Sequence, residues 1–124
     1  MLFDTYAWIG LFTGSDEGRK VGELIKSEAK IYTSILSLAE IAVWCLRNQR
    51  NVEERLDIVK KYSEILDLNE KIAETGGRIN FETRKTVKDF GMMDALIYSS
   101  ARIYGLKLVT GDEHFKNLED VMML

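Results

Sequence analysis

The chain has no proline, a single cysteine and a single histidine among its 124 residues. One cysteine cannot form an internal disulfide. Because Cys45 stands in an apolar run, we expect a buried, inert thiol and a reducing, cytoplasmic setting. No stretch approaches 18 uncharged apolar residues, so we expect no membrane-spanning segment. The apolar N-terminus lacks a basic region and is interrupted by Asp4, so it does not have the pattern of a signal peptide.

An excess of positive charge is also missing. The chain carries 17 Lys and Arg against 20 Asp and Glu, which gives a net charge of −3 and a pI near 5.2. Taken alone, this balance argues against a broad nucleic-acid-binding surface. The 46% of hydrophobic and 30% of charged residues exclude a disordered chain and a membrane protein. Without a linker or a repeat, residues 1–124 are expected to form one domain.

Short apolar segments alternate with amphipathic ones along the chain. This alternation is typical of an α/β domain with a buried, mostly parallel sheet, in which ligands bind at the carboxyl ends of the strands. The expected strands cover residues 2–7, 31–33, 65–68, 107–110 and 120–123. The expected helices start near residue 8, at 15 or 16, and at 35, 52, 69 and 92. The helix from 35 is expected to end at 49, the one capped by Asn69 to run through Gly76, and the last to end at 104 before Gly105.

Three of the apolar runs contain one charged residue each, and each time it is an acid. Asp4 is the only charge in residues 1–12, Glu40 in 35–46 and Asp94 in 90–98. Acidic side chains are seldom buried unless they are paired, and no Lys or Arg lies within one helical turn of Glu40 or Asp94. The compensating charge must come from a distant base or a bound cation, and oxygen ligands favour Mg²⁺ or Mn²⁺ over zinc.

Each acid also has a structural interpretation. Asp4 could cap the first helix, and Glu40 could pair with a remote base such as Arg84 or Arg102. Asp94 lies in a first helical turn, where the dipole favours an acid, and Asp112 could be a plain N-cap. These interpretations do not explain the joint pattern, because Asp4 and Asp112 both follow expected strands. The acids could therefore converge where the strand order switches.

Four segments of the chain resemble the PIN domain, and more closely its VapC-type toxin branch. They are DTYAWI at 4–9, SILSLAEI at 34–41, DALI at 94–97 and GLKLVTGDEHF at 105–115. The resemblance covers essentially the whole chain. It implies a three-layer α/β/α PIN-like domain over residues 1–124, with a central, mostly parallel sheet of four to five short strands. The positions that match the family's four acids and its Ser/Thr are Asp4, Glu40, Asp94, Asp112 and Thr110.

The same resemblance implies RNA cleavage that depends on Mg²⁺ or Mn²⁺, with one or two ions. Asp4, Glu40 and Asp94 are the expected direct or water-mediated ligands. Asp112 is expected to support these ligands from behind or to belong to a second metal site, and Thr110 to orient a water or a phosphate. The implied role is that of a homodimeric toxin, held inactive by a cognate antitoxin protein.

RNA must also be bound. The candidate contacts at the cleft edge are three bases that precede Asp94: Arg84, Lys85 and Lys88. Trp8 and Tyr6 could stack on bases, but core packing is the expected role of both. His114, the only histidine, has polar neighbours and is expected at the surface.

Two other functions stay open. A phosphoryl-receiving signalling domain also clusters acids and Mg²⁺ at a sheet edge, although only one acid follows the first strand here. A non-catalytic interaction domain could pair its acidic cleft with basic residues of a partner.

Overall fold

The computed structural model describes all 124 residues and centres on a parallel sheet. Its five strands are β1 (Leu2–Phe3), β2 (Tyr32–Ser34), β3 (Glu64–Leu66), β4 (Leu108–Thr110) and β5 (Val121–Met123). They lie in the order β3-β2-β1-β4-β5, and all four neighbouring pairs are parallel. The predicted α/β class and its parallel sheet are confirmed.

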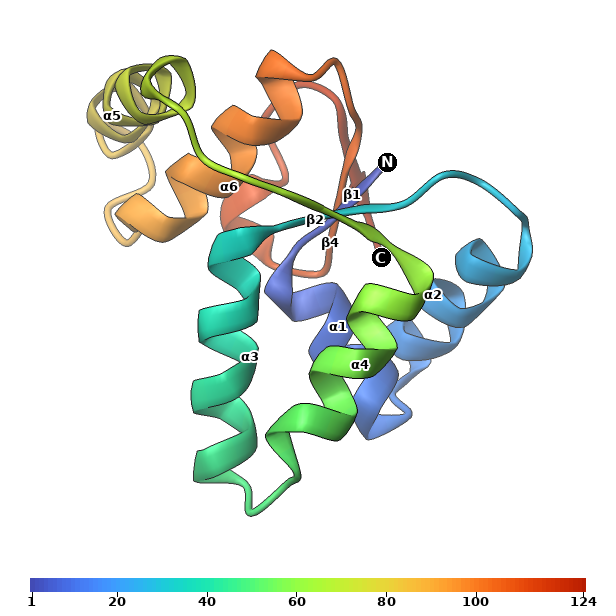
Figure 1. Cartoon of the computed structure of the whole chain (residues 1–124). Helices are drawn as coiled ribbons and strands as arrows, with labels where there is room; N and C mark the ends of the chain where they lie inside the picture. Colours follow the sequence, from blue (N-terminus) through green and yellow to red (C-terminus); the bar gives the residue numbers. More distant parts are fainter.

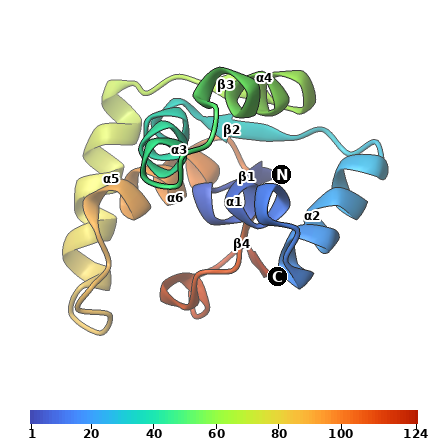
Figure 2. The same cartoon turned by 90° about the horizontal axis from the view of Figure 1, so that it is seen from below.

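Six helices cover the two faces of the sheet. They are α1 (Thr5–Thr13), α2 (Asp16–Lys26), α3 (Ile35–Arg47), α4 (Val52–Tyr62), α5 (Glu70–Thr83) and α6 (Met92–Ile103), followed by a short 3₁₀ helix, η1 (Glu113–Phe115). Figure 1 shows α5 and α6 on one side of the strands and the helices α1 to α4 on the other. Figure 2 gives the same arrangement from below. The result is the expected three-layer α/β/α architecture.

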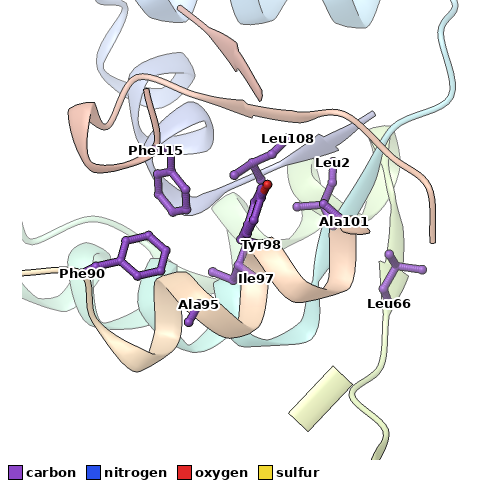
Figure 3. Close-up of a cluster of buried hydrophobic side chains, with 9 residues drawn as sticks. All are labelled: Leu2, Leu66, Phe90, Ala95, Ile97, Tyr98, Ala101, Leu108 and Phe115. Carbon is purple, nitrogen blue, oxygen red and sulfur yellow. The ribbon is translucent and has the colours of Figure 1, made fainter. Parts of the chain in front are cut away.

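The side chains of the strands alternate between the two faces of the sheet and contribute to two hydrophobic cores. Successive strand residues point to opposite faces of a sheet. Leu2 and Leu108 accordingly join the cluster between the sheet and α6, which also contains Ile97, Tyr98 and Ala101 (Figure 3). Their neighbours Phe3 and Val109 join the opposite cluster, which contains the buried Trp8, Val21, Ile41 and Cys45. This confirms the expectation that Cys45 is a buried thiol.

The first strand is shorter than predicted. The expected strand over 2–7 is wrong, because β1 ends at Phe3 and α1 begins at Thr5. The Asp4 side chain accepts a hydrogen bond from the Ala7 backbone N–H at 2.9 Å and so starts the helix earlier. The other strand boundaries are within two residues of those predicted. The helix capped by Asn69 continues beyond Gly76 to Thr83, and α3 ends at Arg47 rather than at 49.

Helices α1 and α2 approach each other through two glycines. A Cβ atom added to Gly18 would lie 1.9 Å from the carbonyl oxygen of Gly10, so only a residue without a side chain fits there. Gly14 closes α1 with a positive φ of 69°, which allows the tight connection between the two helices. None of the six helices combines the length and the apolarity that crossing a bilayer requires.

The strand order switches at β1. The chain leaves β1 to form β2 and then β3 on one side, and later returns to form β4 and β5 on the other. Crevices outside the carboxyl ends of parallel strands at such a point are the usual ligand sites of open α/β sheets. The carboxyl ends of β1 and β4 are adjacent here, since Phe3 pairs with Val109.

Candidate functional site

Asp4 and Asp112 follow the two strands that meet at the switch point. The Asp4 side chain is buried with 5% exposure and caps α1 through Oδ1. Asp112 is half-buried, and its Oδ1 accepts the backbone N–H of His114 at 2.9 Å. The Asp112 backbone N–H donates in turn to Thr110 Oγ1 at 2.9 Å. Both carboxylates are thus oriented by the turn that follows their strand.

Glu40 and Asp94 reach the same place from two helices. Glu40 lies in the second turn of α3, where its Oε1 accepts a hydrogen bond from Thr5 Oγ1 at 2.6 Å. Asp94 lies in the first turn of α6, so its charge faces the positive end of the helix dipole. All four acids line one cavity of about 210 Å³. The remaining lining residues are Thr5, Tyr6, Ile9 and Ile97.

No lysine or arginine neutralises the four carboxylates. The ion pairs of the chain join Lys and Arg to other acids, and only the His114 ring approaches one of the four, Asp112. Of the two bases suggested for Glu40, Arg102 instead pairs with Glu119 and Asp120, and Arg84 forms no ion pair. Asp4 and Asp112 do act as caps, but capping leaves their charges uncompensated.

Burial and the crowding of negative charge raise the pKa values of two of the acids, Asp4 and Asp94. Burial, together with the negative charges of Asp112 and Asp94, raises the pKa of Asp4 to about 7, although hydrogen bonds from the Thr110 hydroxyl and the Ala7 N–H oppose the rise. Burial also raises the pKa of Asp94 to about 6, with added repulsion from Asp112 and Glu40. The site is therefore short of positive charge.

The donor set fits a divalent cation. One oxygen each of Asp94 and Asp112 and one nitrogen of His114 lie within 4.8 Å of one another. The Nδ1 atom of His114 is buried without a hydrogen-bond partner. Carboxylate oxygens are the ligands that Mg²⁺ and Mn²⁺ prefer, and Asp4 and Glu40 add two more carboxylates to the same cavity.

Two residues lie elsewhere than the sequence indicated. Tyr6 is not in the core: its side chain is 44% exposed and lies over Gly111, where an added Cβ would come within 2.3 Å of the ring. Trp8 is buried as expected, and its Nε1–H donates to Thr33 Oγ1 at 3.0 Å. His114 is half-buried beside Asp112 rather than free at the surface. The only feature of the sequence that could have indicated this position of His114 is that it stands two residues after Asp112.

The predicted RNA contacts stand apart from the acids. Arg84, Lys85 and Lys88 are exposed, and none of them lines the acidic cavity. Lys85 pairs with Glu82 at 3.1 Å. Another base, Arg47, lies two turns after Glu40 on α3 and lines the adjoining groove.

That groove is larger and more apolar than the acidic cavity. It has a volume of about 470 Å³ and runs along α1 and α3. Thr5, Ile9 and Glu40 line both hollows, so the groove and the acidic cavity are adjacent. The residues lining only the groove are Ala39, Val43, Trp44, Arg47 and Met93.

Comparisons with known proteins agree with the fold. Residues 1–121 match the family model described as the PIN domain. No match was found among curated proteins. A toxin–antitoxin complex from Klebsiella pneumoniae is similar in structure, with a TM-score of 0.77, 23% identity, and coverage of 98% of this chain and 95% of that one. VapBC2 from Rickettsia felis, bound to a DNA fragment from its promoter, has a TM-score of 0.76, 23% identity, and coverage of 99% and 96%. VapC20 from Mycobacterium tuberculosis, described as a toxin that cleaves the sarcin–ricin loop, has a TM-score of 0.77, 17% identity, and coverage of 97% and 95%.

Proposed function

The chain belongs to the PIN domain family, and from this premise we propose that it is a metal-dependent endoribonuclease acting as the toxin of a toxin–antitoxin pair. The convergence of four acids from four separate segments carries the proposal. They meet at the switch point of the sheet, and no lysine or arginine neutralises them. Unpaired carboxylates crowded in this way are costly in a folded protein unless they serve a cation.

The surroundings of each acid suggest its role in binding the metal ion. Asp4 and Asp94 would gain most from the charge of the ion, because they are the two whose charged forms the metal-free fold disfavours. Glu40 is oriented by the Thr5 hydroxyl and would complete the ligand set, directly or through water. Asp112 would hold a second ion or support the first, and Thr110 would fix the Asp4 carboxylate.

A bound divalent ion lowers the pKa of water and stabilises the charge that develops on the scissile phosphate. The chain's own residues would orient and desolvate the reacting groups. Ile9 and Ile97 form an apolar wall of the cavity, which limits competing water. Tyr6, exposed at the rim, offers a face for stacking on an RNA base.

The antitoxin is proposed to occupy the apolar groove beside the acids. Several structures similar to this chain are toxin–antitoxin complexes. An amphipathic segment could bury apolar side chains against Val43, Trp44 and Met93 and extend a basic side chain toward Glu40. The homodimer stays a prediction from the family resemblance.

The experiment is a cleavage assay on the purified full chain with single-stranded RNA, in Mg²⁺, in Mn²⁺ and in EDTA. We expect cleavage with either ion and none in EDTA. Glu40→Gln and Asp94→Asn should each lower the rate by about 100-fold or more, since even supporting residues of metal sites cost about 10–100-fold.

A matched control is Asp89→Asn, which removes an exposed acid five residues before Asp94. It should cleave like the wild type. Normal cleavage by Glu40→Gln and Asp94→Asn, or cleavage that persists in EDTA, would rule out the proposed site. A stable acyl-phosphate after incubation with a small phosphodonor would favour the signalling alternative instead.

A further inference from the structure

The one histidine of the chain lies at the candidate site with an unused ring nitrogen. The His114 side chain is 39% exposed, but its Nδ1 atom is buried and makes no hydrogen bond. This atom lies 3.3 Å from Asp112 Oδ1, without the geometry of a hydrogen bond. A buried polar atom of this kind requires a partner.

The surroundings of the His114 ring suit a metal ion. His114 offers one nitrogen within 4.8 Å of one carboxylate oxygen each of Asp94 and Asp112. With metal–ligand distances of about 2.0–2.3 Å, donor atoms around a single ion are separated by up to about 4.5 Å. A small adjustment therefore brings all three donors onto one ion.

The fold holds the ring in this place. His114 is the second residue of η1, and its backbone N–H is fixed by Asp112 Oδ1. The next residue, Phe115, is buried and packs against Phe90 with ring centroids 5.3 Å apart. These two contacts anchor the backbone at His114, so that its ring starts from a fixed position beside Asp112.

We propose that His114 is a nitrogen ligand of a divalent ion shared with Asp94 and Asp112, and that it makes the site favour Mn²⁺ over Mg²⁺. The inference rests on the proposed function in taking this ion to be the one that supports cleavage. Mg²⁺ is bound almost wholly by oxygen, whereas imidazole nitrogen suits transition metals, to which Mn²⁺ belongs. Replacing one oxygen or water ligand by nitrogen thus shifts the preference.

The other role open to His114 is that of a protonated counter-ion, which would neutralise Asp112 without touching a metal. The two roles differ in a measurable way. A ligand nitrogen is bonded directly to the bound ion, and a counter-ion is displaced by it.

The experiment is pulsed electron paramagnetic resonance of Mn²⁺ bound to the untagged full chain. A directly coordinated imidazole gives a characteristic ¹⁴N modulation, and His114 is the only histidine that could produce it. We expect the modulation in the wild type and in Glu113→Gln, an exposed neighbour, and its loss in His114→Asn. In competition titrations, the ratio of Mn²⁺ to Mg²⁺ affinity should fall by about tenfold in His114→Asn.

Bound Mn²⁺ without ¹⁴N modulation would overturn the inference, as would an unchanged affinity ratio in His114→Asn. If the wild type nevertheless cleaves RNA, the proposed function survives that result. A clear ¹⁴N signal in a protein that cleaves no RNA would support the ligand and reject the ribonuclease. A protein that binds no Mn²⁺ at millimolar concentration would contradict both.

Discussion

Replacing Asp4 with asparagine should make the metal-free protein less sensitive to pH. Asp4 is buried, and its pKa rises from an ordinary value of 3.8 to about 7. Below about pH 4 the carboxyl group is protonated in both the folded and the unfolded chain. Between pH 4 and 7 only the folded chain keeps the proton, and above pH 7 both are ionised. The stability contributed by the neutral carboxyl is therefore lost as the pH rises from about 4 to 7.

The size of this loss follows from the two pKa values. They differ by about 3 pH units, and each unit corresponds to about 1.4 kcal/mol. Ionising Asp4 should thus lower the free energy of unfolding by about 4 kcal/mol in total. Between pH 5 and pH 8 the loss should be about 3 kcal/mol. Asparagine keeps an oxygen for the Ala7 N–H and carries no charge, so Asp4→Asn should lack this component.

The assay is urea unfolding at several pH values in EDTA, followed by circular dichroism. At pH 8 the Asp4→Asn variant should be more stable than the wild type. Saturating Mn²⁺ should reverse the order, because only the wild type keeps the full ligand set. Asp57→Asn, which changes an exposed acid on α4, should follow the wild type throughout. Equal pH slopes for Asp4→Asn and wild type, or a less stable Asp4→Asn at pH 8, would refute the reasoning.

Three further predictions follow from packing, exposure and charge. Gly18→Ala should lower the free energy of unfolding by about 3 kcal/mol, because the new Cβ would meet the Gly10 carbonyl oxygen at 1.9 Å. A Cβ added to Gly77 on α5 has no atom within 4 Å, so Gly77→Ala should raise the free energy of unfolding by about 0.5–1 kcal/mol. Thermal unfolding of both variants is the measurement, and equal effects of the two substitutions would contradict the close contact at Gly18. Tyr6→Ala should weaken the binding of an oligoribonucleotide in EDTA by about tenfold while Tyr6→Phe does not, as judged by fluorescence anisotropy; equal affinities would exclude stacking. The RNA affinity should fall only shallowly with salt, since the chain has 17 bases against 16 acids outside the site; a slope equivalent to about six or more phosphate contacts would contradict this.

The architecture could be predicted because it depends on the spacing of apolar residues along the chain, which the sequence shows directly. The alternation of short apolar and longer amphipathic segments indicated a parallel sheet. Within the first strand, Leu2 and Phe3 point to opposite faces of the sheet, and each belongs to a different hydrophobic core. The end of the first strand was not predictable from apolarity alone. Residues 2–7 suit a strand and a buried helix equally, and the choice is made by the hydrogen bond from the Ala7 N–H to Asp4.

The parts of the site that sequence reasoning missed depend on tertiary contacts. Tyr6 stands in the same mostly apolar segment as Trp8, yet the absence of a side chain at Gly111 leaves room for the Tyr6 ring outside the core. His114 has polar neighbours in the sequence, but its position beside Asp112 depends on the turn that the Asp112 side chain caps and on the burial of Phe115. The bases at 84, 85 and 88 follow the end of α5, whose length beyond Gly76 the pattern did not predict.

Helix capping and metal binding are compatible roles for the same carboxylate. From the sequence, Asp4 and Asp112 had to be either caps or site residues, but a carboxylate has two oxygens. Oδ1 of each accepts a backbone N–H, at 2.9 Å in both cases, and this contact fixes the plane of the group. Capping thereby orients the carboxylate before any ion arrives, which lowers the entropy that binding must overcome. An amide side chain preserves the cap and removes the charge. Substitution by asparagine at Asp4 or Asp112 therefore separates the contribution to the fold from the contribution to the site.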